Sequence, residues 1–245
     1  MTRSRLDQAL VTRGLVSTRS QAESYIKLGT VTVNTKQITK SGFPVDAEDI
    51  IELTAQERYV SRAALKLASV AKSLKLDFQD KVVLDVGSST GGFTDYSLRY
   101  GAEKVIAVEL GTQQLHSSLR GHPKIDLHEQ TDIRNIKILT DTPDLVVVDV
   151  SFISLREILP HLSTLIDQHT AVIAMVKPQF EAQQSSLKHK GVIKNDTMRR
   201  QILKDFEAWL RTNWIIEDKA DSAVKGAKGN QERFYVLRSS QAKRH

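Results

Sequence analysis

Residues 81–93 constrain the fold more than any other part of the chain. They read Lys-Val-Val-Leu-Asp-Val-Gly-Ser-Ser-Thr-Gly-Gly-Phe. A short apolar run that ends in a glycine-containing loop is typical of a parallel strand that passes into a helix beside a nucleotide pocket. Gly87 permits a tight turn, and Gly91 and Gly92 let the backbone approach a ligand. Because the spacing differs from the G-x-G-x-x-G of dinucleotide enzymes, the motif alone does not identify the ligand.

From about Tyr59 onward, apolar runs of strand length alternate with longer amphipathic segments. This alternation predicts a Rossmann-like α/β domain with a mainly parallel sheet. The predicted strands are 82–86, 104–109, 125–128, 144–149, 171–176, 214–217 and 233–237, and the predicted helices are 60–74, 91–100 and 196–210. The last two strands leave an antiparallel arrangement open.

The composition excludes several classes of protein. The chain of 245 residues has no cysteine, which excludes disulfides and thiolate metal sites, and its histidines lack metal-ligand spacing, so we predict no metal. No window approaches the ~20 apolar residues of a spanning helix, and the N-terminus lacks a signal-peptide pattern. We therefore expect a cytoplasmic protein without a membrane partner. A net charge of +6 favours a polyanionic partner.

The first 53 residues form a basic module of their own. Four arginines stand against one acid in the first twenty residues: Arg3, Arg5, Arg13 and Arg19 against Asp7. Apolar spacing predicts two short helices with Ser17 or Thr18 as a cap between them, then strands at 31–34 and 50–53, and a linker at 54–58. The arginines could be a solvated helix face, but their clustering in so small a module favours contacts with phosphates.

This module resembles an S4 RNA-binding domain. The resemblance is carried by Arg5-Leu6-Asp7, by residues 14–22 (Gly-Leu-Val-Ser-Thr-Arg-Ser-Gln-Ala) and by residues 26–34 (Ile-Lys-Leu-Gly-Thr-Val-Thr-Val-Asn). It implies that the arginine-rich helices and the turn that follows grip structured RNA. The residues it implies as RNA contacts are Arg3, Arg5, Arg13, Arg19 and Lys27. Thr35 departs from the family, which usually places glycine there.

Acidic residues follow successive predicted strands of the larger domain. Glu109 lies about 20 residues beyond the glycine loop, where an acid can accept hydrogen bonds from ribose hydroxyls. Asp132 could bind an adenine amino group, and Asp85 could orient a charged amino-acid end, although such acids also cap helices. Without a P-loop lysine, S-adenosylmethionine fits better than ATP or NAD. The predicted cofactor residues are Asp85, Gly87, Ser88, Gly91, Gly92, Phe93, Glu109, Asp132 and Asp149.

Four further residues are candidates for the chemistry: Lys66, Asp149, Lys177 and Glu232. A lysine at the end of an apolar strand is costly to bury without a partner, and Asp149 is the nearest candidate for Lys177. A purely structural ion pair is the alternative. The order Lys-Asp-Lys-Glu resembles the catalytic tetrad of FtsJ-like ribose 2′-O-methyltransferases.

An S4 domain at residues 1–58 ahead of an FtsJ-like domain at residues 59–245 is similar to the TlyA family. The resemblance implies an S-adenosylmethionine-dependent methyltransferase that modifies the 2′-hydroxyl of cytidine in ribosomal RNA, with ribosomal subunits as partners. We expect a monomer or a weak dimer. Proteins of this family are often labelled haemolysins, but the sequence shows no pore-forming segment.

The implied reaction needs a base, because a ribose hydroxyl is a weak nucleophile. Lysine is normally protonated at neutral pH, with a pKa of ~10.4 in model peptides. A second cation such as Lys66 would favour a neutral Lys177, whereas Asp149 and Glu232 would favour its charged form. The sequence leaves open which effect prevails.

Three other functions remain possible from the sequence. Asp149-Val150-Ser151-Phe152 loosely resembles the D-P-P-Y-type loop of base N-methyltransferases, without its prolines. A non-catalytic RNA-binding module would need the arginines but not the acids of the pocket. A membrane-active toxin has the least support.

Overall fold

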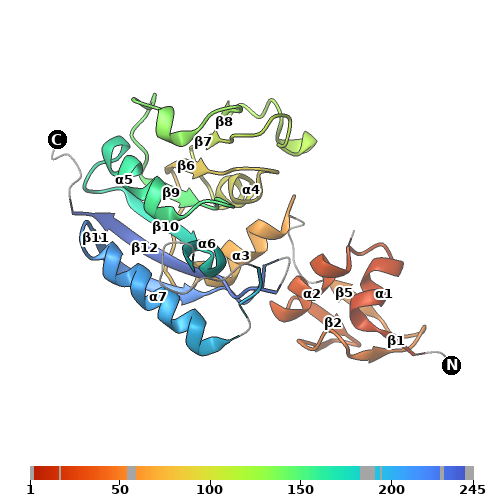
Figure 1. Cartoon of the computed structure of the whole chain (residues 1–245). Helices are drawn as coiled ribbons and strands as arrows, with labels where there is room; N and C mark the ends of the chain where they lie inside the picture. The colour runs from red at the N-terminus through yellow and green to blue at the C-terminus, as the bar shows by residue number, and fades with distance from the viewer. Residues whose placement is uncertain are drawn as a thin grey trace.

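The computed structural model describes residues 3–16, 18–53, 59–182, 191–193, 195–226 and 229–240. Ser17 and the predicted linker at 54–58 lie outside these ranges. The chain forms a small N-terminal part and a large α/β part, and helix α2 of the first lies against helix α3 of the second (Figure 1). No helix in the described ranges is long and apolar enough to cross a membrane.

The N-terminal part packs two helices on short strands. Its elements are β1 (Ser4–Arg5), α1 (Leu6–Thr12), α2 (Arg19–Lys27), β2 (Val31–Val33), β3 (Lys36–Gln37), β4 (Pro44–Val45) and β5 (Ile51–Leu53). The Thr18 hydroxyl caps α2 by accepting from the Gln21 N–H at 3.2 Å. Asn34 and Thr35 both have positive φ in the β2–β3 turn, so the threonine adopts the left-handed conformation for which glycine is usual.

The large part is built on a seven-stranded sheet with the order β11-β12-β10-β9-β6-β7-β8. Its strands are β6 (Val82–Val86), β7 (Lys104–Val108), β8 (Ile125–His128), β9 (Leu145–Val148), β10 (Ala171–Val176), β11 (Trp214–Asp221) and β12 (Arg233–Ser239). β6 to β10 are parallel, and β12 runs antiparallel to both β10 and β11. The antiparallel arrangement that the sequence left open is therefore the one observed.

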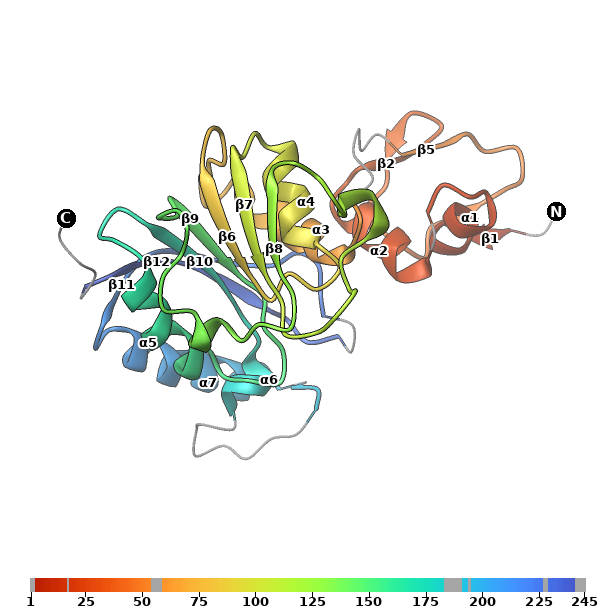
Figure 2. The ribbon, with the colours of Figure 1, turned by 90° about the horizontal axis from the view of Figure 1, so that it is seen from above.

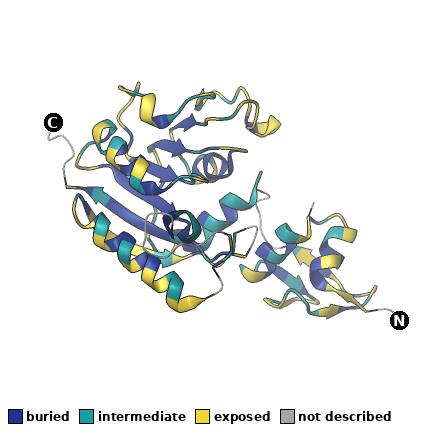
Figure 3. Cartoon of the chain, in the orientation of Figure 1, coloured by how far each residue is buried: buried dark blue, intermediate teal, exposed yellow. Residues whose placement is uncertain are grey.

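Alternate residues of the parallel strands face opposite sides of the sheet, and both sides are covered (Figures 2 and 3). Val83, Val105 and Val147 pack with α3 (Arg62–Ala71) and α4 (Gly92–Arg99). Leu84 and Val146 pack on the other side with α5 (Leu155–Leu165) and α7 (Asp196–Leu210). Burial on both sides explains why these strands read as nearly continuous apolar runs.

Helix α5 was not among the predicted elements. The Ser154 hydroxyl caps it by accepting from the Arg156 N–H at 3.1 Å, and Pro160 lies inside it. Proline lacks the N–H that a helix interior needs, so the pattern around Pro160 argues locally against a helix. Burial of Leu155, Ile158, Leu159 and Leu162 against the sheet outweighs that cost. Short helices η1 (Ser117–Leu119), η2 (Ile133–Asn135) and α6 (Pro178–Glu181) complete the large part.

Candidate functional site

A cavity of about 610 Å³ opens where the strand order reverses, at the carboxyl ends of β6, β7 and β9. Ligands of open α/β sheets bind at such a switch point. Of the predicted cofactor residues, Gly87, Glu109, Asp132 and Asp149 line this cavity. Its volume lies within the usual range for small-molecule pockets, ~300–1,000 Å³.

The three glycines of the loop after β6 face different surroundings. Gly87 has φ +83°, and a Cβ there would lie 2.8 Å from the Asp149 carbonyl oxygen. Gly91 has φ +87° and precedes α4, and its Cβ position faces Leu115. The Cβ position of Gly92 lies 2.7 Å from Ala63 Cβ on α3, and Phe93 is buried in the core. Gly87 thus lines the cavity, whereas Gly91, Gly92 and Phe93 serve the turn and the helix packing.

Glu109 and Asp132 lie at the cavity with different partners. The Glu109 carboxylate accepts from the Ser89 N–H at 2.8 Å and from the Gly111 N–H at 2.7 Å, which fixes it beside the glycine loop. Asp132 caps η2 and pairs with Arg134 at 2.6 Å. The Arg134 hydrogen bond is the main cause of the lowered pKa of Asp132. Asp132 therefore combines a position in the cavity with the capping role that the sequence offered as the alternative.

Asp85 lies beneath the loop and not at the cavity surface. Its side chain is fully buried, and one oxygen accepts from the Thr94 hydroxyl at 2.6 Å. The other oxygen has no hydrogen-bond partner in the part of the chain that the structure describes, and the same holds for the buried Ser88 hydroxyl. Burial raises the pKa of Asp85 to about 7, against the opposing effect of Thr94.

Lys177 meets Asp149 as the sequence predicted. Its Nζ lies 2.5 Å from Asp149 Oδ1 and donates to the Ser151 hydroxyl at 2.7 Å. The Lys177 side chain is only 9% exposed. The parallel pairing of β9 and β10 creates this contact, because the two strands end at the same edge of the sheet.

Lys66 and Glu232 form a second ammonium–carboxylate pair, with 2.6 Å between Nζ and Oε2. The Lys66 side chain is 12% exposed. In the β10–β12 register Val176 pairs with Arg233, so the next residues along, Lys177 and Glu232, fall opposite each other. Burial raises the pKa of Glu232, and the charge of Lys66 opposes that rise. The four predicted catalytic residues therefore come together at one edge of the sheet.

Three residues of the site were not predicted. Ser151 binds Lys177, and Phe152 beside it has φ +66° and is 88% exposed. The Phe152 ring lies 5.3 Å from that of Phe180. The buried Glu181 accepts from the Ser154 hydroxyl at 2.6 Å and from the Leu155 N–H at 2.8 Å. It thereby joins the loop after β9 to the segment after Lys177. The aromatic residue three positions after Asp149 was the available signal, whereas nothing in the pattern identified Glu181.

Two of the predicted RNA-binding arginines in the N-terminal part converge on Asp7. Arg5 and Arg19 both lie 2.9 Å from its Oδ2, and their side chains are 47% and 52% exposed. Asp7 is fully buried, which raises its pKa, but the hydrogen bonds and charges of the two arginines prevail and lower it. The cluster holds two cations at the surface in fixed positions.

The other three basic residues differ among themselves. Arg13 donates to the backbone carbonyls of Asp46, Ala47 and Asp49, which gives it a structural role. Arg3 pairs with Asp46 at 3.4 Å, and Lys27 is exposed at the end of α2.

The fold and the site define a Rossmann-like methyltransferase with an added N-terminal domain. The FtsJ-like methyltransferase profile matches residues 59–239, and the S4 domain profile matches residues 4–51. The chain therefore belongs to the FtsJ-like methyltransferase family, in the group with an S4 domain that includes the TlyA proteins.

Two curated relatives and one solved structure illustrate the similarity. The 16S/23S rRNA (cytidine-2′-O)-methyltransferase TlyA of Mycobacterium tuberculosis is 34% identical, over 97% of this chain and 90% of its own length. The 23S rRNA (cytidine-2′-O)-methyltransferase TlyA of Campylobacter jejuni is 41% identical, over 73% of this chain and 70% of its own length. A solved structure from Streptococcus thermophilus, described as a candidate hemolysin, is 32% identical with a TM-score of 0.71, and covers 99% of this chain and 90% of its own.

Proposed function

We propose that this protein transfers a methyl group from S-adenosylmethionine to the 2′-hydroxyl of a cytidine in ribosomal RNA. The observation that carries the proposal is a set of two largely buried ion pairs, Lys177–Asp149 and Lys66–Glu232, at one edge of the sheet beside the cavity. Removing charges from water is costly, and such clusters concentrate at functional sites. The names of the TlyA relatives support the choice of ribosomal RNA and of cytidine.

Residues that line the cavity suit the binding of S-adenosylmethionine. Gly87 lines the cavity and lets its loop lie against the Asp149 backbone, and Glu109 presents a carboxylate in the cavity for ribose hydroxyls. Asp132 lies at the next strand end, where it could hold the adenine. When bound, this cofactor supplies an electrophilic methyl group on a sulfonium centre. Asp149 connects the cavity with the four charged residues because it belongs to both.

Lys177 is the proposed base that accepts the proton of the ribose hydroxyl. Asp149 and Ser151 hold its Nζ from two sides, which leaves the remaining direction for the substrate hydroxyl. Lys66 adds a second positive charge to the site, and Glu232 holds Lys66 in place. A positioned base of this kind contributes ~10²- to 10⁴-fold to the rate.

The surroundings of the site suggest how RNA would be held. Phe152 follows Ser151, which binds Lys177, and its ring is exposed. Its backbone has positive φ, which is a genuine outlier for a bulky residue. A flipped-out base can stack on an aromatic side chain of this kind. Arg5 and Arg19 would contact phosphates from the N-terminal part. A ribosomal substrate would place the protein in the cytoplasm, as the sequence predicts.

Mapping of methyl groups in ribosomal RNA tests the proposal. Purified ribosomal subunits and naked ribosomal RNA would be incubated with labelled S-adenosylmethionine and either this protein or its Asp149→Ala variant. We expect label in an alkali-resistant ribose 2′-O-methylcytidine with the wild-type protein alone. Label in a base would favour the N-methyltransferase alternative, and binding of RNA without transfer would favour the non-catalytic one.

A further inference from the structure

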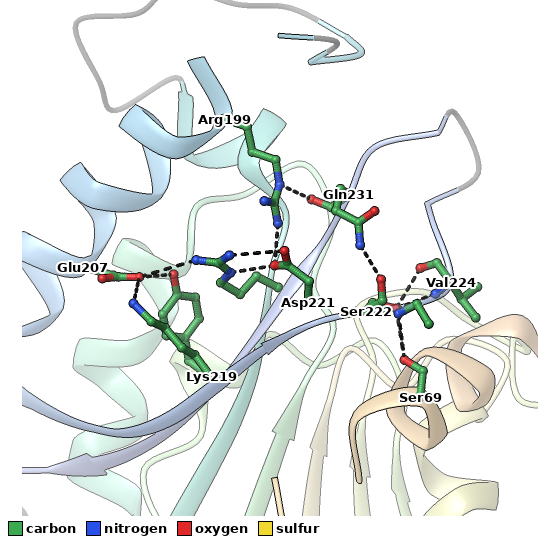
Figure 4. A network of polar contacts seen from close by, with 11 residues as sticks. Ser69, Arg199, Glu207, Lys219, Asp221, Ser222, Val224 and Gln231 are labelled. Carbon is green, nitrogen blue, oxygen red and sulfur yellow. Dashed lines mark hydrogen bonds and ion pairs between the residues drawn. The ribbon is translucent and has the colours of Figure 1, made fainter. Parts of the chain in front are cut away.

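Ser69 connects the helix that carries Lys66 to the segment that leads to Glu232 (Figure 4). Its hydroxyl donates to the Lys66 carbonyl at 2.6 Å, one turn back along α3. The same oxygen accepts from the Ala223 N–H at 3.2 Å and lies 3.4 Å from the Ser222 hydroxyl. Ser222 and Ala223 directly follow β11, so Ser69 joins residues that are far apart in the sequence.

Ser222, on the other side of this contact, is hydrogen-bonded to the backbone of Glu232. The Ser222 N–H donates to the Glu232 carbonyl at 3.0 Å, and the Gln231 side-chain amide donates to the Ser222 carbonyl. Arg199 secures the same stretch from α7 by donating to the Gln231 carbonyl at 3.1 Å. The Glu232 backbone is thus bonded to Ser222, and Ser69 contacts Ser222 and Ala223 from α3.

We propose that Ser69 is a positioning residue that sets the separation of Lys66 and Glu232. The proposal rests on the methyl transfer proposed above, because it assigns the pair a role in that reaction. Lys66 Nζ and Glu232 Oε2 are 2.6 Å apart, and both side chains are largely buried. A small shift between α3 and the Glu232 backbone would therefore separate two charges that have little access to water, and misplacement of ~1 Å can cost ~10²-fold in rate.

The chain offers a control just beyond the end of the same helix, in the turn that follows Ala71. Ser73 donates to the Val70 carbonyl at 2.9 Å, just as Ser69 donates to Lys66, and this contact stays within its own segment. Alanine at either position removes a hydroxyl that donates to the carbonyl three residues back. Comparing Ser69→Ala with Ser73→Ala therefore isolates the contacts with Ser222 and Ala223. Ser69→Thr keeps the hydroxyl and should restore the function.

Single-turnover methyl transfer to ribosomal RNA is the first measurement. We expect Ser69→Ala to lower the rate about 10-fold relative to Ser73→Ala, with unchanged affinity for S-adenosylmethionine and near wild-type rate in Ser69→Thr. In a Glu232→Gln background the Ser69→Ala change should add less than about twofold, because both act through one pair. Equal rates for Ser69→Ala and Ser73→Ala, with an active wild type, would overturn the positioning role and leave the methyl transfer standing.

Crystal structures of the two alanine variants test the same inference without the reaction. We expect the Lys66 Nζ–Glu232 Oε2 distance to exceed the ~4 Å limit of an ion pair in Ser69→Ala only. A wild type that transfers no methyl group would refute the proposed function. The crystal structures would still show whether Ser69 sets the distance between Lys66 and Glu232. An unchanged distance in Ser69→Ala would overturn the inference.

Discussion

The N-terminal part and the large part each bury an aspartate completely, but the pKa values of the two carboxyl groups are shifted in opposite directions. Asp7 binds Arg5 and Arg19, and despite its burial these cations lower its pKa. Among the described residues no cation contacts Asp85, which accepts from the Thr94 hydroxyl, and burial raises its pKa to about 7. Whether a buried carboxylate stays charged is thus decided by the cations supplied to it and not by burial alone.

The two ion pairs of the site resemble Asp7 in having cation partners and Asp85 in lying away from water. Lys177 and Lys66 supply a cation for each carboxylate, as the arginines do for Asp7, but here the cations are largely buried as well. The arginines around Asp7 remain about half exposed, so they can still meet phosphates. Exposed cations can reach the phosphates of a polyanion, whereas the two largely enclosed ammonium groups are held in place by their carboxylate partners.

Substitution of Lys177 should produce the largest effect. We expect both Lys177→Ala and Lys177→Arg to lower the single-turnover rate by ~10²- to 10⁴-fold, because a guanidinium stays protonated at any working pH. Melting temperature and cofactor affinity are the controls for folding and binding. If Lys177 were only the partner of Asp149 in a structural pair, arginine would keep most of the rate.

The two aspartates should differ in how stability depends on pH. Because the native pKa of Asp85 is raised above its unfolded value of ~3.9, the wild type loses up to about 4 kcal/mol as the pH rises from ~4 to ~7. Asp85→Asn should therefore gain stability relative to the wild type across this window and level off above it. Asp7→Asn should instead be destabilised by a constant amount above pH ~5, and the loss should shrink below ~4, since the native pKa of Asp7 is lowered. Urea unfolding at several pH values measures the free energy of unfolding of both variants and of the wild type. If the difference between Asp85→Asn and the wild type did not change with pH, the raised pKa of Asp85 would be contradicted.

Removal of the Glu109 carboxylate should weaken cofactor binding. We expect Glu109→Ala to cost ~1–3 kcal/mol in S-adenosylmethionine affinity, the usual loss for a hydrogen-bonding partner of a buried polar group. The backbone N–H groups of Ser89 and Gly111 also lose their acceptor, so part of this cost reflects the loop. Titration calorimetry measures the affinity, and an unchanged value in the folded variant would exclude the ribose contact.

The smallest effect should come from single arginines of the N-terminal part. Arg19→Gln should reduce the slope of log affinity for RNA against log salt by about 1, as expected for one lost phosphate contact. Arg13→Gln is the matched control, because its guanidinium is bound to three backbone carbonyls. It should lower the melting temperature and keep the slope. Equal slopes for Arg19→Gln and the wild type would argue against Arg19 as an RNA contact.

Sequence reasoning succeeded where strand order alone decides the geometry. Asp149 and Lys177 could be paired in advance, because parallel strands end at a common edge. It could not place Asp85 below the surface, since a residue at the end of a strand can point to either side of the sheet. The Glu181 contact with Ser154 depends on how the segment after β10 folds back, and no local pattern encodes that path. Helix α5 was missed because Pro160 opposes it locally while tertiary burial favours it.

The pairing of β12 with β10 has a consequence for how the site forms. Lys66 and Glu232 lie 166 positions apart (232 − 66), and the β10–β12 ladder that brings Glu232 to Lys177 is among the last parts of the sheet in chain order. Closing so long a loop is slow compared with forming local contacts. The cofactor cavity is made from earlier strands, so it could form in a nascent chain before Glu232 joins Lys66, Asp149 and Lys177. The site for proton abstraction would then be the last part of the molecule to form.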